Sequence, residues 1–252
     1  MSEWWTYTLS DFLLFSSRTY YRLFEIYNAA IWPAQVAGIL LGVGILALLL
    51  LRRTSRGRSF AAILAVCWLF VAIAFHAHRY ATINWAAVYF AWAFGVEAAL
   101  LVWIGIVRGQ VSFDPPSDGR SRAGLAIFLF ALLIEPALGP LLGRGWKGVG
   151  IFGTTPDPTA IATLGILLLA RVRHRWLLMA IPAIWCTISG ATLLALKAPD
   201  FWVPPVAAGV AASLAVLQTR RRRPKEGQGN IAGSQPQRRR RCRLRWPRVP
   251  RR

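Results

Sequence analysis

Apolar runs separated by short polar segments make up most of this 252-residue chain. A hydrocarbon core about 30 Å thick requires about 20 residues of α-helix to cross it. Seven runs approach that length, at residues 34–51, 60–75, 85–107, 123–142, 155–170, 176–196 and 204–218. The second, fifth and seventh are short, so they would borrow flanking residues or thin the bilayer, and the seventh could fail to cross. We therefore predict an all-α, polytopic transmembrane helical bundle of about seven spans, with six as the alternative.

Basic residues between the runs predict the orientation of the chain, because short cytoplasmic loops of membrane proteins carry excess Lys and Arg. The loops after the first, third and fifth runs carry ten of these residues, against six on the opposite side. The tail after Leu217 adds fourteen to the richer side if the number of spans is odd. The sequence thus predicts an outside N-terminus and a cytoplasmic C-terminus, and it favours seven spans over six.

The segment before the first run predicts an interfacial helix. Residues 17–31 carry aromatic and aliphatic side chains at helical spacing, with Arg22 and Glu25 along the other side. This pattern is typical of an amphipathic helix lying in the outer interface. We expect an Arg22–Glu25 pair at i,i+3 and a bend into the membrane at Pro33. The helix is either a packing anchor or a gate or docking surface for a partner.

Composition supports a membrane protein and weighs against a nucleic-acid partner. Charged residues are 16% of the chain and hydrophobic residues 56%, whereas soluble domains carry about a quarter charged residues. The net charge of +20 is concentrated in the tail. No phosphate loop, nucleophile elbow or zinc helix is present, and the three cysteines lack metal or disulfide spacing. We therefore expect no enzymatic activity and no cofactor.

The arginine-rich tail, residues 220–252, has too few apolar residues to fold. Basic residues beside a membrane gain about 1 kcal/mol each from anionic lipid. Besides the bilayer itself, the predicted partner is therefore anionic lipid, bound through Arg220, Arg221, Arg222 and Arg223. The alternatives are that the tail adheres to RNA or ribosomes, or that it is arginine-rich coding sequence without a function. Three regions follow: the interfacial segment 1–33, the transmembrane domain 34–219 and this tail.

Two carboxyls lie where lipid is expected. Glu97 and Glu135 each come twelve residues into runs that cross in opposite directions, so both should lie near the bilayer midplane. A charge there costs about 2.5 to 3.5 kcal/mol on insertion scales, so each carboxyl should be protonated, paired or facing a wet cavity. The pair could share a proton or bind a cation. Alternatively, each is a neutral glutamic acid that hydrogen-bonds across two helices for packing.

Prolines accompany these acids. Pro136 follows Glu135 directly, and Pro182 lies within the sixth run. Proline removes a backbone hydrogen bond, and a broken helix beside an acid is a feature of midplane sites in transporters. The candidate intramembrane polar site is therefore Glu97, Glu135, Pro136 and Pro182. Asp157, between Pro156 and Pro158, predicts a turn and a helix start.

His76 and His78 are weaker candidates at the outer end of the second run. Residues two apart on a helix point to different faces, so the pair is a poor chelate. They could capture a metal ion or a proton outside the membrane, but we prefer a solvated helix cap. No metal site is predicted elsewhere.

Tryptophans divide into two groups. Six lie near the ends of the runs, where indole rings favour the membrane interface: Trp32, Trp85, Trp103, Trp146, Trp176 and Trp202. Trp68, Trp92 and Trp185 lie in mid-run, where an indole N–H needs a partner. We predict that these three face protein rather than lipid.

Several segments resemble an uncharacterised bacterial family of polytopic membrane proteins. They are LSDFLLF at 9–15, YYRLFEIYN at 20–28, AIWPAQ at 30–35, PTAIATLG at 158–165 and the Ile181–Pro182 helix. The resemblance covers about residues 9–215 and leaves out the tail. It implies a bacterial inner-membrane location, and because the family's function is unknown it supplies no activity. Asp157 stands where this pattern would have a small residue or cysteine.

Two functions fit these observations. The first is a small transporter or permease-like protein that moves a proton, cation or small solute past Glu97 and Glu135. The second is a noncatalytic membrane scaffold or accessory subunit that docks partners through the N-terminal helix and the basic tail.

Overall fold

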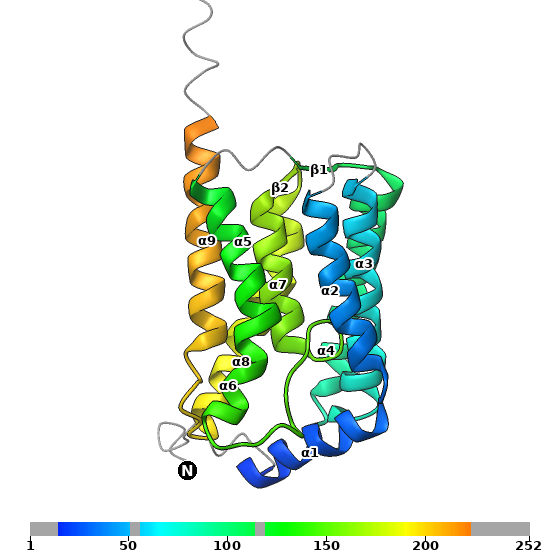
Figure 1. Cartoon of the computed structure of the whole chain (residues 1–252), viewed down its shortest axis with the longest axis vertical. Coiled ribbons are helices and arrows are strands. Elements are labelled where there is room, and N and C mark those ends of the chain that lie inside the picture. The colour runs from blue at the N-terminus through cyan, green and yellow to red at the C-terminus, as the bar shows by residue number, and fades with distance from the viewer. Residues whose placement is uncertain (1–14, 51–55, 114–118, 223–252) are drawn as a thin grey trace, which may run out of the picture. The chain divides into compact units, whose positions relative to one another are not determined.

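The computed structural model describes residues 15–50, 56–113 and 119–222. It divides the chain into two compact units, Met1–Ala215 and Val216–Arg252. The second unit is described only over the helical residues 216–222. The elements are α1 (Ser17–Ala30), α2 (Ala34–Leu50), α3 (Arg56–Phe70), η3 (Val71–Ala77), η4 (Tyr80–Thr82), α4 (Ala87–Leu100), η5 (Leu101–Val107), β1 (Val111–Phe113), α5 (Gly119–Leu129), η6 (Phe130–Ile134), α6 (Glu135–Leu141), α7 (Pro156–Leu169), β2 (Ala170–Val172), α8 (Arg175–Ala195) and α9 (Val203–Arg222) (Figure 1).

All seven apolar runs are helical. Among the described residues, four helical segments are long and apolar enough to cross a membrane: Arg56–Thr82, Ala87–Val107, Arg122–Leu141 and Arg175–Ala195. A fifth is possible if α1 and α2, which meet at 87°, count as one span, whereas α7 and α9 are shorter apolar helices. The structure therefore confirms a largely helical chain with several helices of membrane-spanning length. Seven spans stay a prediction, and the all-α expectation missed the small ribbon of β1 and β2.

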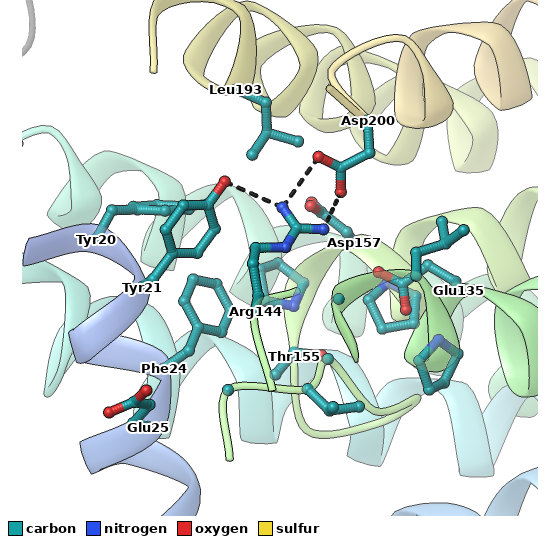
Figure 2. Close-up of a pocket in the computed structure, with 18 of the residues that line it drawn as sticks. Tyr20, Tyr21, Phe24, Glu25, Glu135, Arg144, Thr155, Asp157, Leu193 and Asp200 are labelled. Carbon is teal, nitrogen blue, oxygen red and sulfur yellow. Dashed lines mark hydrogen bonds and ion pairs between the residues drawn. The ribbon is translucent and has the colours of Figure 1, made fainter. Parts of the chain in front are cut away.

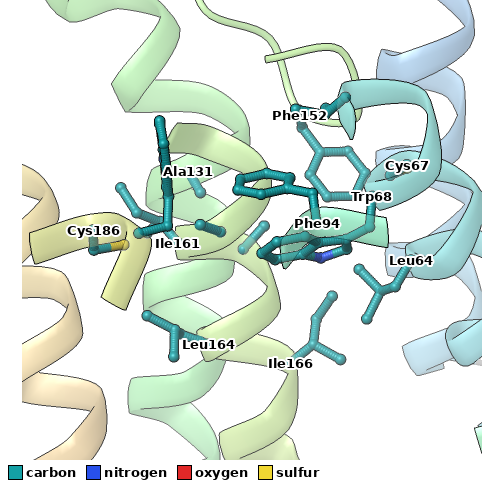
Figure 3. Packing of buried hydrophobic residues seen from close by; sticks show 14 of the residues in the cluster. Leu64, Cys67, Trp68, Phe94, Ala131, Phe152, Ile161, Leu164, Ile166 and Cys186 are labelled. Carbon is teal, nitrogen blue, oxygen red and sulfur yellow. The ribbon is translucent and has the colours of Figure 1, made fainter. Parts of the chain in front are cut away.

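Helix α7 lies in the interior of the first unit. Every residue from Pro158 to Leu168 is buried, and α3, α5 and α8 pack against the helix. A helix that is apolar all round belongs among other helices. Its few polar groups are satisfied, because Thr163 Oγ1 donates to the Thr159 carbonyl at 2.7 Å and accepts from Trp68 Nε1 at 2.9 Å. Trp68 also packs on Phe94, with ring centroids 4.3 Å apart (Figure 3).

Large apolar side chains cover the outward sides of the helices. Examples more than 40% exposed are Ile39, Leu40, Val43, Val66, Leu69, Ile73, Val96, Leu133, Ile184 and Val210. A surface so apolar is unusual for a soluble monomer and typical of a chain that contacts lipid. Trp92 is part of this surface at 74% exposed, so the prediction that it faces protein is wrong. It follows Val88 and precedes Val96 at spacings of four, on the outward stripe of α4.

The three basic loops meet at one end of the bundle. Strands β1 and β2 pair antiparallel with Val111 opposite Val172, which joins the loops after the third and fifth runs. Arg56, at the start of α3, donates to the Phe113 carbonyl and ties the loop after the first run to β1. Helix α1 lies across the opposite end of the bundle (Figure 1). The described parts of these loops therefore lie at one end of the bundle, and their placement on one side of a membrane stays a prediction.

Helix α1 is amphipathic as predicted and packs on the bundle. Ser16 caps it by accepting from Thr19 N at 3.2 Å, and Arg22 pairs with Glu25 at 2.7 Å. The buried Tyr27 hydroxyl donates to the Thr154 carbonyl at 2.6 Å. Burial raises the pKa of Tyr27, so this hydroxyl stays protonated and able to donate. These contacts fit the packing-anchor interpretation of α1.

Three helices widen into π-helical turns, η3, η5 and η6. Such turns are rare and occur often at functional sites. Segment η6 ends directly before Glu135 and Pro136, yet residues 122–141 form one continuous helix. The wide turn accommodates the missing N–H of Pro136, so the helix is widened rather than broken. Pro182 likewise lies inside the continuous helix α8.

Candidate functional site

A cavity of about 90 Å³ lies beneath α1, between the start of α6, the segment 144–150 and the start of α7. This volume accommodates several water molecules. Aromatic rings from α1 form one wall, and carboxyl groups from other elements face it (Figure 2). The charged lining residues are Glu25, Glu135, Arg144, Asp157 and Asp200. We call this space the α1 cavity.

Glu135, the first residue of α6, lines the α1 cavity. Its Oε1 and Oε2 lie 3.4 and 3.5 Å from the position that a Cβ on Gly150 would occupy. Glu135 Oε2 is buried and has no hydrogen-bond partner among the described residues. The sequence predicted that this carboxyl is protonated, paired or facing a wet cavity. The structure shows that it lines a cavity.

Glu97 lies elsewhere in the bundle. It is 0% exposed in α4, and within the described chain neither of its carboxylate oxygens has a hydrogen-bond partner. Helix α4 packs mainly against α3, η3 and α8, and Glu97 does not line the α1 cavity. The structure thus does not bring the two predicted glutamates together at this cavity.

Asp157 connects the cavity to helix α8. It lies in the first turn of α7, as the sequence predicted for a helix start. Its Oδ1 accepts from Trp185 Nε1 at 2.7 Å, and its Oδ2 accepts from Ser189 Oγ at 2.8 Å. Trp185 is 5% exposed, so this tryptophan faces protein as predicted. The two donors lie one turn apart on α8 and fix the carboxylate at the cavity wall.

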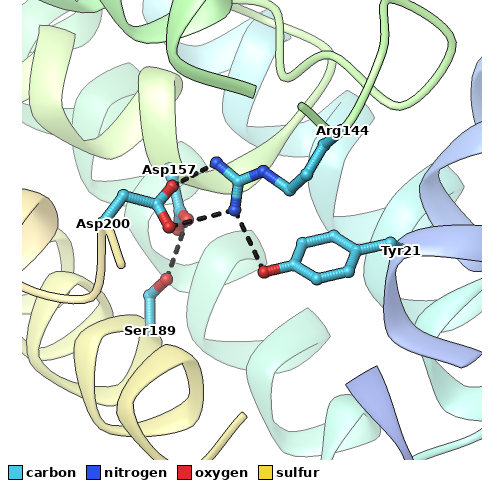
Figure 4. A network of polar contacts seen from close by, with 5 residues as sticks. All are labelled: Tyr21, Arg144, Asp157, Ser189 and Asp200. Atoms are coloured by element: carbon cyan, nitrogen blue, oxygen red, sulfur yellow. Dashed lines mark hydrogen bonds and ion pairs between the residues drawn. The ribbon is translucent and has the colours of Figure 1, made fainter. Parts of the chain in front are cut away.

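Arg144, which also lines the cavity, joins three segments of the chain (Figure 4). Its guanidinium donates to both carboxylate oxygens of Asp200, between α8 and α9, with the Nη1–Oδ1 distance at 3.0 Å. Nη1 also donates to the Tyr21 hydroxyl of α1 at 3.0 Å, and the guanidinium lies 5.1 Å from the centre of that ring. Burial opposes the charge, but the hydrogen bonds with Asp200 and Tyr21 outweigh it and raise the pKa of Arg144. The side chain is therefore a permanent cation.

Removing one partner of the Arg144–Asp200 pair should destabilise the protein measurably. The two side chains are only 21% and 15% exposed, so Asp200→Asn leaves a partly buried guanidinium short of its counter-ion. We expect a loss of about 1.5–3 kcal/mol in the free energy of unfolding. Denaturant unfolding in detergent measures it. Glu25→Gln breaks the Arg22–Glu25 pair, whose side chains are 67% and 31% exposed, and should cost no more than about 1 kcal/mol. Equal losses of unfolding free energy in both variants would contradict a stabilising role for the contacts of Arg144 with Asp200 and Tyr21, which we call the Arg144 junction.

The histidines have separate environments. His76 is 0% exposed, with its ring 4.4 Å from Phe94 and 4.8 Å from Trp185 between centroids. The solvated-cap interpretation is therefore wrong for His76, because the π-helical turn η3 places it between α4 and α8. His78 is exposed, which confirms that the pair does not share a face. Within the described chain, no group of three or more His, Cys, Asp or Glu side chains is arranged to hold a metal ion.

The remaining predicted residues lie apart from the cavity, except Pro136, which lines it beside Glu135. Pro182 is buried in α8 and is not among the lining residues. Arg223 lies outside the described residues, and Arg220, Arg221 and Arg222 are described only as helical backbone. The predicted lipid contacts of these arginines therefore stay predictions.

Sequence reasoning missed Arg144, Asp200 and Tyr21 as site residues. Arg144 and Asp200 lie in different loops, 56 positions apart, and the pattern of the N-terminal amphipathic helix does not single out Tyr21. One signal was available, because Arg144 stands between Gly143 and Gly145, which have φ of +80° and +73°. Glycine is the residue that adopts this backbone readily. Two such residues around a single arginine indicate a loop shaped to place that side chain.

These features define a helical protein with four apolar helices of membrane-spanning length and a charged cavity beneath an amphipathic helix. Residues 17–226 match a family of unknown function (DUF6064), and the chain belongs to that family. The match confirms the resemblance to an uncharacterised family. Comparisons with curated proteins and with solved structures gave no match.

Proposed function

We propose that this protein is a small permease of the bacterial inner membrane that moves a proton, a cation or a small solute through the α1 cavity past Glu135. The observation that carries the proposal is a buried carboxylate oxygen of Glu135 that has no hydrogen-bond partner among the residues described and lines a cavity large enough for water. An ionisable group inside a spanning helix is expensive and usually serves transport or proton transfer.

The surroundings of Glu135 support movement at this point. The π-helical turn η6 and Pro136 flank the acid on either side. Backbone there lacks the regular hydrogen-bond pattern, so the α6 end can shift at lower cost than an unbroken α-helix. Alternating access would then combine a displacement of α6 with release of α1 at the Arg144 junction.

The proposed multi-pass topology places α1 outside and the β1–β2 end in the cytoplasm. It is supported by the basic loops gathered at the β1–β2 end and by exposed tryptophans near the helix ends, including Trp32, Trp85 and Trp146. Reporter fusions test it. A periplasmic phosphatase fused before Ser17 should be active, and a fluorescent protein fused after Arg252 should fluoresce in the cytoplasm. A periplasmic C-terminus would reverse the orientation.

Transport is tested with the full chain reconstituted in liposomes. Concentration jumps of protons, sodium, potassium and small organic solutes are applied, and charge movement or internal pH is recorded. We expect at least one of them to cause a flux that empty liposomes lack. If none produces a flux in either orientation of the gradient, the permease proposal is wrong.

The scaffold function predicted as the alternative uses α1 as a docking surface. The apolar residues Tyr20, Leu23 and Tyr27 of α1 are buried against the chain's own bundle, which leaves only the opposite side of α1 for a partner. A stoichiometric partner that co-purifies with the full chain and is lost on deleting residues 1–31 would favour this function over transport.

A further inference from the structure

The carboxyl groups of the α1 cavity outnumber its cations. Four carboxyls and one guanidinium line it. Glu25 and Asp200 are each paired with an arginine, whereas within the described chain Glu135 and Asp157 have no ion-pair partner. Asp157 accepts from two neutral donors, which hold it in place without neutralising it. The cavity therefore offers two carboxyls that a positively charged guest could neutralise.

The aromatic wall of the cavity also suits a cation. Tyr20, Tyr21 and Phe24 of α1 line it, and Glu135 and Asp157 lie across the cavity from them (Figure 2). Cations bind favourably over aromatic faces within about 6 Å of the ring centre. The chain already contains one such arrangement, because Arg144 lies 5.1 Å from the centre of the Tyr21 ring while it pairs with Asp200. Glu135 lines the same cavity as Tyr20 and Phe24 and has no ion-pair partner among the described residues.

The shape of the cavity limits the guest to a few heavy atoms. Its volume is about 90 Å³, and Gly150 lines it together with Glu135. A methyl group on Gly150 would lie 3.2 Å from Thr155 Oγ1 and 3.4 Å from Glu135 Oε1. The missing side chain thus leaves the approach to the Glu135 carboxylate open. Apolar wall residues such as Pro136 and Leu193 leave room for a short carbon chain.

We propose that the α1 cavity binds a small primary organic ammonium ion, whose ammonium group pairs with Glu135 and whose carbon chain lies against the rings of α1. The inference deepens the proposed permease function, on which it rests, by naming the substrate class. Anions are disfavoured by the unpaired carboxyls, and a neutral alcohol of the same size lacks the charge that Glu135 would attract.

Binding is tested on the full chain in detergent by saturation-transfer NMR titration. Ethylammonium is the probe, with ethanol and acetate as neutral and anionic counterparts and sodium chloride at constant ionic strength. We expect saturable binding of ethylammonium alone. Glu135→Gln should weaken it by about tenfold to a hundredfold, the range of a charge-assisted hydrogen bond. Glu97→Gln, which changes a buried carboxyl outside the cavity, should leave the affinity unchanged.

A second variant keeps every charge and changes only the space. Gly150→Ala adds a methyl group beside the Glu135 carboxylate, so it should weaken ethylammonium binding while the protein elutes as a monodisperse species.

The inference is overturned if wild type, Glu135→Gln and Gly150→Ala bind ethylammonium with equal affinity. It is also overturned if ethanol binds equally well, or if sodium at equimolar concentration competes with ethylammonium. Flux of protons or metal ions without ethylammonium binding overturns the inference and leaves the permease standing. Ethylammonium binding without any flux overturns the permease and leaves the ammonium site.

Discussion

Replacing Glu135 with glutamine is expected to abolish flux through the reconstituted protein while the chain stays folded. The substitution preserves the size of the side chain and removes its charge and its exchangeable carboxyl proton. Glu135 Oε2 is buried at the cavity and has no hydrogen-bond partner in the described part of the chain, so an amide there loses little packing. A loss of about 1.5–3 kcal/mol of interaction with a charged solute corresponds to a tenfold to hundredfold weaker complex. Charge movement in liposomes, at matched protein content, measures the effect.

Glu97→Gln is the matched control for that measurement. Both glutamates are in helices of membrane-spanning length, but only Glu135 lines the α1 cavity. Flux should therefore persist in Glu97→Gln and disappear in Glu135→Gln. Normal flux in the double variant would contradict transport through either carboxyl. Loss of flux in Glu97→Gln alone would place the pathway in the α4 region and not beneath α1.

Much of the fold followed from hydropathy, because each apolar run of sufficient length can bury its backbone only as a helix. The seven runs are helical, and the basic loops meet at one end. Helix α1 was also predictable, since its polar and apolar sides alternate with the helical period and Arg22 and Glu25 fall at i,i+3.

Which residues of a helix face lipid and which face protein was less predictable. A run that is apolar on all sides has no pattern that distinguishes its lipid-facing side from its protein-facing side. Trp92 and Phe94 illustrate this on one helix, since the former is 74% exposed and the latter 1%. His76 is a second case. Its burial depends on the π-helical turn η3, which changes the register of the helix and has no signature in the residue pattern.

The candidate site was only partly predictable for the same reason. Glu135 and Pro136 were recognisable as an acid and a proline within an apolar run. Arg144 and Asp200 lie in polar loops, where charged residues normally contact water, and only the fold brings their side chains together beneath α1. Asp157 was assigned to a helix start, and its bonds to Trp185 and Ser189 depend on how α7 and α8 pack.

Gly165→Ala should destabilise the packing of α5 against α7 in the interior of the bundle. Helices α5 and α7 approach each other at Gly124 and Gly165. A Cβ on Gly165 would lie 2.7 Å from the Gly124 carbonyl oxygen and 2.8 Å from the Phe128 backbone nitrogen. Backbone atoms cannot rotate away as a side chain can, so the two helices would have to separate. Overpacking of this kind costs about 1–3 kcal/mol or more, which denaturant unfolding in detergent would detect.

The control for Gly165→Ala is Gly95→Ala, because Gly95 also lies in a helix and a Cβ there would meet nothing within 4 Å. Alanine favours a helix over glycine by about 0.5–1 kcal/mol, so this variant should be as stable as the wild type or more stable. Gly124→Ala should behave like Gly165→Ala, since its Cβ would lie 2.8 Å from the Gly165 carbonyl oxygen. If all three variants unfold alike, close contact between α5 and α7 does not stabilise the bundle, and the buried position of α7 has to come from its other neighbours.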